Sequence, residues 1–265
     1  MSLRALFIGD IVGTPGRKIV AEKLPALRER LRVDFCIANS ENASGGSGIT
    51  CANARTLLKS GVDVITMGDH VWKRKEIATL METEARILRP YNYSPLSAGT
   101  GVGIYTLPNE VKIAVINLVG RVFMKPADCP FRAVDEALRQ IMPHTRNIII
   151  DMHAEATAEK IALGWHLDGR VTAVLGSHTH VQTADECILP NGTAFICDVG
   201  MTGPYDSVLG RRKDRVIKAT ITQMPFPFDV AKGDVRLSGA LVAFDPETGR
   251  AEAIERVHVR EGALP

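Results

Sequence analysis

The sequence predicts an α/β protein with parallel strands, and three observations support this prediction. Segments typical of strands and of helices alternate from the amino terminus onward, which favours parallel pairing. Residues 171–176 form a short, uninterrupted run of mostly β-branched and apolar side chains, as expected of a strand buried on both faces. The chain has 265 residues, of which 45% are hydrophobic, so it can bury a large core.

The first third of the chain contains three strand and helix pairs. Strands are expected at residues 3–8, 35–38 and 62–67. The helices that follow them are expected at residues 17–30, 50–61 and 73–81. Pro25 predicts a kink or a break in the first helix, and Thr50 is expected to cap the second.

The remainder of the chain is less regular but continues this pattern. Further strands are expected at residues 102–106, 112–117, 147–152, 171–176, 187–190 and 193–197. Helices are expected at residues 131–142 and around Glu159 and Lys160, and Asn191 with Gly192 predicts a hairpin turn. Beyond residue 210 the pattern changes to strands alone, at residues 216–222, 235–244 and 251–259.

Composition and charge argue against several classes of protein. The net charge of +2 gives no indication of a polyanionic partner. No secretory leader is recognisable, and no apolar run approaches the ~18 to 20 residues of a membrane span, so we expect a cytoplasmic protein without a membrane partner. The five cysteines are scattered and form no C-x-x-C pair, which argues against a disulfide framework and a zinc ribbon.

Side chains able to bind metal ions follow five of the predicted strands. They are Asp10, Glu41 with Asn42, Asp69 with His70, His153, and His178 with His180. Each alone has an ordinary explanation as a turn, cap or core residue, but together they predict a site beyond the carboxyl ends of the strands. His178 and His180 would point the same way in an extended segment, because alternate side chains share a face.

The number and kind of these side chains indicate two metal ions. Even with His70 set aside, three carboxylates and three imidazoles exceed the ligands that one zinc ion takes. A mixture of oxygen and nitrogen ligands suits manganese, iron or zinc. We therefore expect two divalent ions.

The order of these residues resembles that of the calcineurin-like binuclear metallophosphoesterases. Five motifs are more closely similar to the YmdB-like bacterial branch: GDIVG at 9–13, ENA at 41–43, HAEAT at 153–157, HTHVQTAD at 178–185 and DVGMTGP at 198–204. The likeness runs from about residue 3 to residue 239. It implies a four-layer α-β-β-α sandwich, with two mixed β-sheets flanked by helices, in a single metallophosphoesterase domain over residues 1–265.

The resemblance also implies a ligand set for each ion. One ion would be held by Asp10, Glu41, Asn42 and His180, and the other by Glu41, Asp69, His153 and His178. Three positions depart from the usual superfamily pattern. Val12 replaces a common histidine ligand, Glu41 replaces a bridging aspartate, and Asp69 stands where asparagine is usual. The first two changes are typical of the YmdB-like branch, whereas Asp69 adds a negative charge.

The implied activity is hydrolysis of a 2',3'-cyclic nucleotide to a 3'-nucleotide by a hydroxide that bridges the two ions. Iron or manganese is expected, with zinc as an alternative. His70 would protonate the departing ribose oxygen, or would instead orient Asp69. The substrate would be a cyclic nucleotide or a 2',3'-cyclic RNA end, and the resemblance implies a homo-oligomer. A phosphomonoesterase, a protein phosphatase and a metal-dependent nucleotide sensor remain alternatives.

Three further segments are candidates for substrate contacts. Thr202, Gly203 and Tyr205 are expected to line the substrate pocket, with an ordinary turn as an equal alternative. Residues 45–48 could bring backbone amides near a phosphate, but no Walker A lysine follows, so a mobile connection is favoured. The basic residues between 211 and 215 are expected to form a solvated face, with an RNA-binding rim as the alternative.

Overall fold

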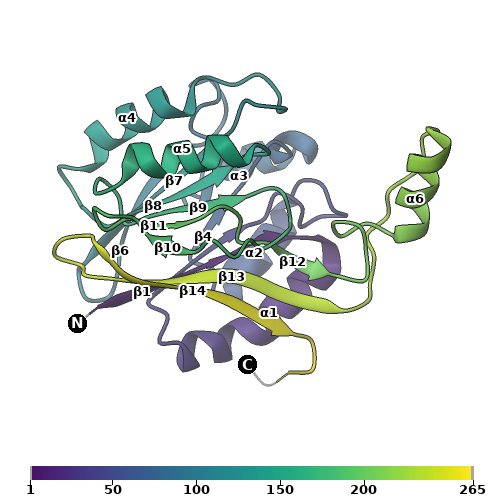
Figure 1. The fold of residues 1–265 in the computed structure, drawn as a ribbon, viewed down its shortest axis with the longest axis horizontal. Coiled ribbons are helices and arrows are strands. Elements are labelled where there is room, and N and C mark those ends of the chain that lie inside the picture. The colour runs from purple at the N-terminus through teal and green to yellow at the C-terminus, as the bar shows by residue number, and fades with distance from the viewer. Residues whose placement is uncertain (1, 264–265) are drawn as a thin grey trace.

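Two β-sheets form the centre of the molecule in the computed structural model, which describes residues 2–263 (Figure 1). In the first sheet, the parallel strands are β1 (Leu3–Ile8), β3 (Phe35–Asn39), β4 (Val64–Thr66) and β5 (Ile87–Leu88). The long antiparallel hairpin β13 (Val235–Phe244) and β14 (Ala251–Arg260) extends this sheet beyond β1. The short strands β12 (Met201–Pro204) and β2 (Asp10–Ile11) complete it.

The second sheet has the order β10-β11-β9-β8-β7-β6. Its strands are β6 (Val102–Thr106), β7 (Lys112–Val119), β8 (Ile148–His153), β9 (Ala173–Ser177), β10 (Cys187–Ile188) and β11 (Ala194–Ile196). Strands β7, β8, β9 and β11 are parallel, while β6 and β10 are antiparallel edge strands. The apolar run that suggested a buried strand is β9, which has a parallel neighbour on each side.

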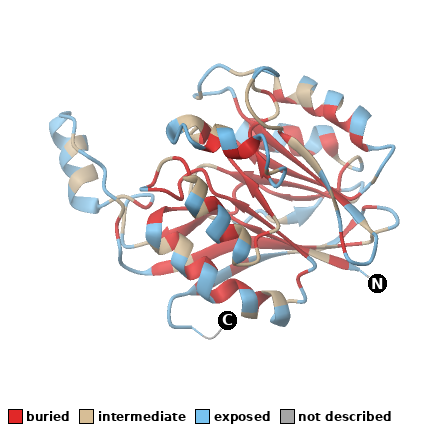
Figure 2. Cartoon of the chain, turned by 180° about the vertical axis from the view of Figure 1, so that it is seen from behind, coloured by how far each residue is buried: buried red, intermediate tan, exposed pale blue. Residues whose placement is uncertain are grey.

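Helices cover the outer face of each sheet. On the first sheet these are α1 (Gly13–Arg30), α2 (Cys51–Lys59) and α3 (Ile77–Met81), which bury apolar side chains with the sheet in one core cluster. On the second sheet they are α4 (Pro130–Ile141) and α5 (Thr157–Leu167). A third cluster, which includes Phe7, Ile37, Val115 and Ile149, fills the space between the sheets. Figure 2 shows the strands buried and the outer faces of the helices exposed.

The predicted four-layer α-β-β-α sandwich with two mixed sheets is therefore confirmed. Within the described residues, no helix is both long enough and apolar enough to span a membrane.

The strand predicted at residues 216–222 is wrong, because this segment is helix α6 (Lys213–Thr222). Its β-branched residues suggested a strand, but Val216 and Thr220 also stand one helical turn apart. The Thr220 hydroxyl donates to the Val216 carbonyl, which is how threonine is accommodated in a helix. Helix α6 projects from the body and has no buried residue (Figures 1 and 2).

Two predicted helices also differ from the structure. The helix expected at residues 17–30 starts earlier, at Gly13, and continues through Pro25 as a single helix. Leu24 and Leu27, on either side of this proline, are fully buried, so packing supports the helix there. The helix expected at residues 73–81 is instead a 3-10 turn, η1 (Val71–Lys73), followed by the short α3.

Candidate metal centre

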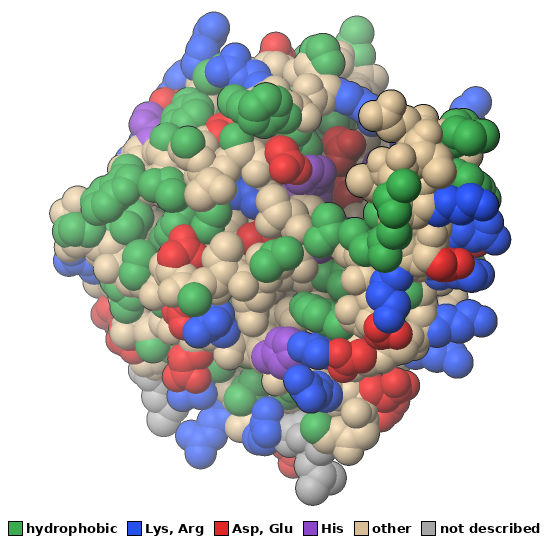
Figure 3. All heavy atoms as spheres, turned by 45° about the vertical axis from the view of Figure 1, so that its right-hand side comes forward, with side chains coloured by type: hydrophobic (Ala, Val, Ile, Leu, Met, Phe, Trp, Pro, Cys, Tyr) green, Lys and Arg blue, Asp and Glu red, His purple; other side chains and the backbone are tan. Residues whose placement is uncertain are grey.

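Parallel strands of both sheets end at the same edge of the molecule, and the predicted site residues lie at these ends. Asp10 follows β1, Glu41 and Asn42 follow β3, and Asp69 and His70 follow β4. His153 is the last residue of β8, and His178 and His180 follow β9. The two sheets pack face to face, so these ends converge. Figure 3 shows a hollow in which histidine and acidic side chains gather.

Four of the residues form a compact group, which we call the buried group: Glu41, Asp69, His153 and His178. One nitrogen or carboxylate oxygen from each lies within 4.8 Å of the others. His153 Nε2 lies 3.3 Å from Glu41 Oε2 and 3.7 Å from Asp69 Oδ1. It also lies 3.0 Å from His178 Nδ1. This is a set of two carboxylates and two imidazoles that could hold one ion.

Asp10, Asn42 and His180 form a second set on the other side of Glu41, which we call the amide-containing set. His180 Nε2 lies 3.8 Å from Asp10 Oδ1 and 3.2 Å from Asn42 Nδ2. The Asn42 amide donates to Glu41 Oε1 at 2.9 Å. Glu41 therefore contacts both sets, as expected of a carboxylate shared by two ions.

Two buried carboxylate oxygens fit a bound cation. Asp10 Oδ1 and Asp69 Oδ1 are inaccessible to solvent and have no hydrogen-bond donor among residues 2–263. Burial of a carboxylate oxygen without a hydrogen-bond donor is unfavourable, because the oxygen loses its hydrogen bonds to water and forms none within the protein. Both oxygens face the imidazoles of the centre, and a divalent cation there would compensate them.

The outer nitrogen of each imidazole has a partner that directs the other nitrogen inward. His153 Nδ1 lies 2.9 Å from Ser177 Oγ, His178 Nε2 3.0 Å from Glu155 Oε2, and His180 Nδ1 3.1 Å from the Leu209 carbonyl oxygen. Such partners fix the ring orientation and the tautomer of histidines that bind metals.

Close packing of charges also shifts the pKa values within the centre. Burial opposes ionisation of Glu41, but the His153 charge outweighs it and holds the pKa of Glu41 well below its usual range. Burial likewise opposes protonation of His153, yet Glu41 raises the pKa of His153 well above its usual value. In the absence of metal, a proton on His153 thus supplies part of the positive charge that the carboxylates require.

The chain also matches known proteins. The YmdB-like protein family matches the chain over residues 6–257. The chain belongs to this family. It is 47% identical over 259 residues to the Bacillus subtilis (strain 168) 2',3'-cyclic-nucleotide 2'-phosphodiesterase, and the match covers 98% of each chain.

Solved structures of the same shape are known. The crystal structure of a hypothetical protein from Thermus thermophilus matches with a TM-score of 0.92 and 40% identity, covering 98% of this chain and 100% of that one. That of a novel phosphatase from Mycoplasma pneumoniae matches with a TM-score of 0.92 and 31% identity, covering 98% and 94%. The family recognised from the sequence motifs is therefore confirmed.

In this YmdB-like chain, His70 lies at the rim of the centre rather than among the buried donors. Its Nδ1 is 2.9 Å from both Glu41 Oε1 and Asn42 Oδ1, and its backbone N–H donates to Glu41 Oε2. The hydrogen bond with Glu41 raises the pKa of His70 above its usual value. A histidine whose protonated form is favoured in this way, and which borders a solvent-accessible hollow, can donate a proton to a bound molecule.

Sequence reasoning missed a buried network behind His153. The Asn39 amide donates to Asp151 Oδ2 at 3.0 Å, and the Ser177 hydroxyl donates to Asp151 Oδ1 at 2.6 Å. Burial raises the pKa of Asp151 to about 6. The signal was an acidic residue within the otherwise apolar strand β8, which is rarely tolerated unless the carboxylate is hydrogen-bonded.

The geometry expected for the two neighbouring histidines is wrong. Strand β9 ends at Ser177, and both His178 (φ 103°) and His180 (φ 66°) adopt left-handed backbone conformations, so this segment is a tight turn. Thr179 holds the turn, because its N–H and its hydroxyl both donate to Asp198 Oδ2, which also pairs with the buried Lys160 at 2.8 Å. Strained conformations of this kind persist where the surroundings impose them.

The basic segment after residue 210 is not a uniformly solvated face. Arg211 is half-buried and lines the hollow of about 290 Å³ that also borders Glu41, His70 and His178. Its guanidinium donates to the carbonyls of Gly45 and Gly46, which ties the glycine-rich loop to the site. The neighbouring Arg212 and Lys213 are exposed, as expected.

The three candidate substrate residues lie on or beside β12. Thr202 and Gly203 are buried, and the Thr202 hydroxyl donates to the Ser238 carbonyl within the sheet. Tyr205 lines a separate hollow next to His180, but its hydroxyl is bonded to Met201 and Ser238. The guanidinium of Arg236 also lies 4.5 Å from the centre of its ring. The hydroxyls of Thr202 and Tyr205 are thus already engaged within the protein.

Proposed function

We propose that this chain hydrolyses 2',3'-cyclic nucleotides to 3'-nucleotides with two divalent metal ions. The observation that carries the proposal is the pair of adjacent donor sets that share Glu41 at the edge of a hollow. The name of the B. subtilis relative, which is 47% identical over nearly the whole chain, supports the choice of substrate. The whole of residues 1–265 would act as one domain.

The proposed ligands are the buried group for one ion and Asp10, Glu41, Asn42 and His180 for the other. Two divalent ions, iron or manganese in preference to zinc, would lower the pKa of a bound water toward about 7 and neutralise phosphate charge. The protein supplies the orientation, since Ser177, Glu155 and the Leu209 carbonyl fix the three imidazole rings.

Two residues at the rim would act on the substrate directly. His70, whose pKa is raised by its hydrogen bond with Glu41, would give its proton to the ribose oxygen that leaves phosphorus. Arg211 brings a positive charge to the same hollow and would attract the anionic phosphodiester. A protein that only binds nucleotides needs no proton donor at this point.

A substrate panel tests this proposal. The purified protein would be assayed after chelation, and again after addition of manganese, with 2',3'-cyclic AMP, 3',5'-cyclic AMP, linear phosphodiesters and phosphomonoesters. We expect metal-dependent formation of the 3'-nucleotide from the 2',3'-cyclic substrate. Preferential hydrolysis of monoesters would indicate a phosphatase instead. If the protein binds the nucleotide stoichiometrically but hydrolyses it with none of the added metals, it is a sensor.

A further inference from the structure

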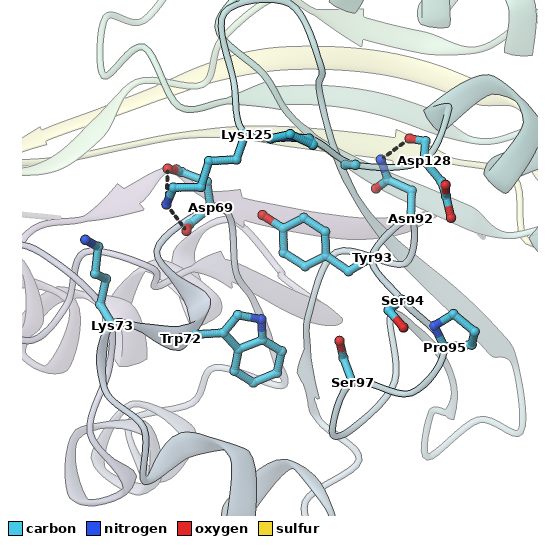
Figure 4. Close-up of a pocket in the computed structure, with 12 residues that line it drawn as sticks. Asp69, Trp72, Lys73, Asn92, Tyr93, Ser94, Pro95, Ser97, Lys125 and Asp128 are labelled. Carbon is cyan, nitrogen blue, oxygen red and sulfur yellow. Dashed lines mark hydrogen bonds and ion pairs between the residues drawn. The ribbon is translucent and has the colours of Figure 1, made fainter.

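A second hollow of about 710 Å³ opens beside the metal centre and shares Asp69 with it (Figure 4). Its floor and walls come from η1, from residues 92–97 and from residues 125–128. The volume lies within the usual range for small-molecule sites, about 300–1,000 Å³. Because Asp69 also belongs to the buried group, this hollow borders the metal centre.

Two aromatic side chains project into the hollow from opposite sides. Trp72 comes from η1 and Tyr93 from the loop after β5 (Figure 4). Both are half-buried, and each packs partly against the core of the first sheet. In Figure 4, no hydrogen bond joins the Trp72 indole N–H or the Tyr93 hydroxyl to another residue that lines the hollow. Burial raises the pKa of Tyr93 to about 12, so its hydroxyl stays a neutral donor.

The walls of the hollow are held in place by the backbone around them. The Asn92 amide donates to the carbonyls of Val119 and Asp128, both at 2.8 Å. The backbone N–H of Asp128 donates in return to the Asn92 carbonyl at 3.0 Å. These bonds join the loop that carries Tyr93 to the loop that carries Lys125. The hollow is thus formed without a ligand, which reduces the cost of binding.

Charged side chains of both signs line the hollow, two lysines and the two aspartates Asp69 and Asp128. Lys73 and Lys125 border the hollow, and Lys125 Nζ lies 3.6 Å from Asp69 Oδ2 at the boundary with the metal centre. Aromatic faces next to lysines are the usual composition of sites that stack bases while attracting phosphate.

We propose that Trp72 and Tyr93 bind the base of the nucleotide whose phosphate lies at the metal centre. This inference rests on the proposed function, because the metal centre must hold the phosphate. Stacking on an aromatic face is tolerant of base identity. The site therefore accepts all four bases, with purines preferred because they offer a larger face to Trp72. The hollow that contains Tyr205 is a poorer candidate, since Arg236 already covers that ring.

A kinetic comparison of two substrates tests the base site. The first is 2',3'-cyclic AMP, and the second is methyl riboside 2',3'-cyclic phosphate, which has the same reacting group but no base. In Trp72→Leu, we expect kcat/KM to fall about tenfold or more for cyclic AMP, mainly through KM, and by less than about twofold for the base-free compound. Trp165→Leu is the matched control, because Trp165 is the other tryptophan and lies exposed on α5.

The outcomes separate this inference from the proposed function. If the unmodified protein hydrolyses neither compound, the proposed function is wrong. If Trp72→Leu loses the same factor on both compounds, or nothing on either, the base lies elsewhere. Trp72→Phe keeps an aromatic face and should recover most of the loss.

A binding measurement decides the matter even if Trp72→Leu fails to fold. In Trp165→Phe, Trp72 is the single tryptophan, and its fluorescence reports on the hollow. We expect 3'-AMP to quench this fluorescence saturably in the metal-loaded protein, whereas ribose 3-phosphate does not. In Trp72→Phe the fluorescence comes from Trp165 alone, so any decrease on addition of 3'-AMP measures the light that the nucleotide absorbs. Equal responses to the two ligands, or no response to either, would overturn the inference.

Discussion

The two donor sets of the metal centre differ in composition although they share Glu41. The buried group has two carboxylates and two imidazoles whose donor atoms lie within 4.8 Å of one another. The amide-containing set adds one carboxylate, one imidazole and the neutral amide of Asn42. The Asn42 amide nitrogen faces Glu41 and His180, while its oxygen lies 2.9 Å from His70 Nδ1, so the amide must turn over to offer an oxygen to an ion. An amide oxygen is also a weaker ligand for a borderline metal than imidazole. If the centre holds two ions, as proposed, the buried group should hold its ion more tightly and the other ion should exchange more readily.

Substitution of the shared carboxylate gives the largest expected effect. Glu41→Ala should remove both ions and abolish turnover, because both sets lose a ligand. The loss should exceed about 100-fold, since even residues behind a metal ligand are worth about 10–100-fold. His153→Ala and His178→Ala should also abolish turnover. Metal analysis of each purified variant, together with kcat/KM on 2',3'-cyclic AMP, checks this expectation.

Asn42→Ala sharpens the comparison between the sets. This variant should keep about one ion per chain under mild dialysis, whereas His153→Ala should lose metal more completely. Equal losses in the two variants would show that the sets do not differ in affinity. Full activity with intact stoichiometry in Glu41→Ala, His153→Ala or His178→Ala would contradict the whole assignment.

His70 should affect the leaving group more than the ions. His70→Ala should slow hydrolysis of 2',3'-cyclic AMP by about 100-fold or more, because general acid catalysis contributes about 10²–10⁴-fold. Aryl phosphodiesters with activated leaving groups should be affected much less, since they need no proton. The measurement is the ratio of the two kcat/KM values at equal metal content. A common factor for both substrates would assign His70 to positioning Glu41 or Asp69.

Removal of the metal by chelation should lower the Tm of the protein. Without cations, Asp10, Glu41 and Asp69 lie close together, so a bound ion favours the folded state. At metal concentrations about 100-fold above Kd, the gain corresponds to roughly 5–10 °C in Tm. Thermal melts with and without verified metal removal measure the effect, and coincident melts would contradict it.

This difference in Tm should narrow as the pH falls from about 7.5 to 5.5. Without metal, His153 has a pKa raised above its unfolded value, so its stabilisation is present below about 6.5 and is lost as pH rises through the folded pKa. Acidification thus protects the chelated protein while protons displace metal from the loaded one. The Glu41 pKa is lowered, so its contribution is lost only under more acidic conditions than this window.

The sequence predicted that these candidate residues lie at the ends of strands, because parallel strands end at a common edge of a sheet. Apolar runs that terminate in Asp, Glu or His carry this information directly. The prediction failed where position depends on tertiary contacts. The turn at His178 and His180 is imposed by Asp198 and Lys160, which belong to other segments and leave no local pattern. Trp72 lies on the short η1 and Tyr93 on a separate loop, and neither segment has a periodic pattern, so only the folded chain shows their common hollow.

Helix α6 was mispredicted for the opposite reason. No residue of this helix is buried, so tertiary contacts did not decide its structure. The β-branched side chains of Val216, Ile217 and Ile221 favour a strand, while their spacing also suits a helix. The local sequence pattern alone therefore does not distinguish a strand from a helix in this segment.

The smallest expected effect concerns the negative charge that Asp69 adds to the buried group. Asp69→Asn removes this charge, which should ease deprotonation of the attacking water and move the acid limb of kcat/KM toward lower pH. The positive charge of Lys125 partly offsets the negative charge of Asp69, because Lys125 Nζ lies 3.6 Å from Asp69 Oδ2. Lys125→Met keeps the length of the side chain but removes the charge, so it should move the same limb toward higher pH.

The two variants form a matched pair with opposite signs. Each shift should be only a few tenths of a pH unit, because Lys125 is largely exposed and the metal ions dominate the local field. The position of the acid limb, and not its height, is the readout, since Lys125 also borders the base site and could change KM. Profiles measured with the same metal at equal occupancy provide the test. Shifts of the same sign, or coincident profiles, would show that charge at Asp69 does not tune the attacking water.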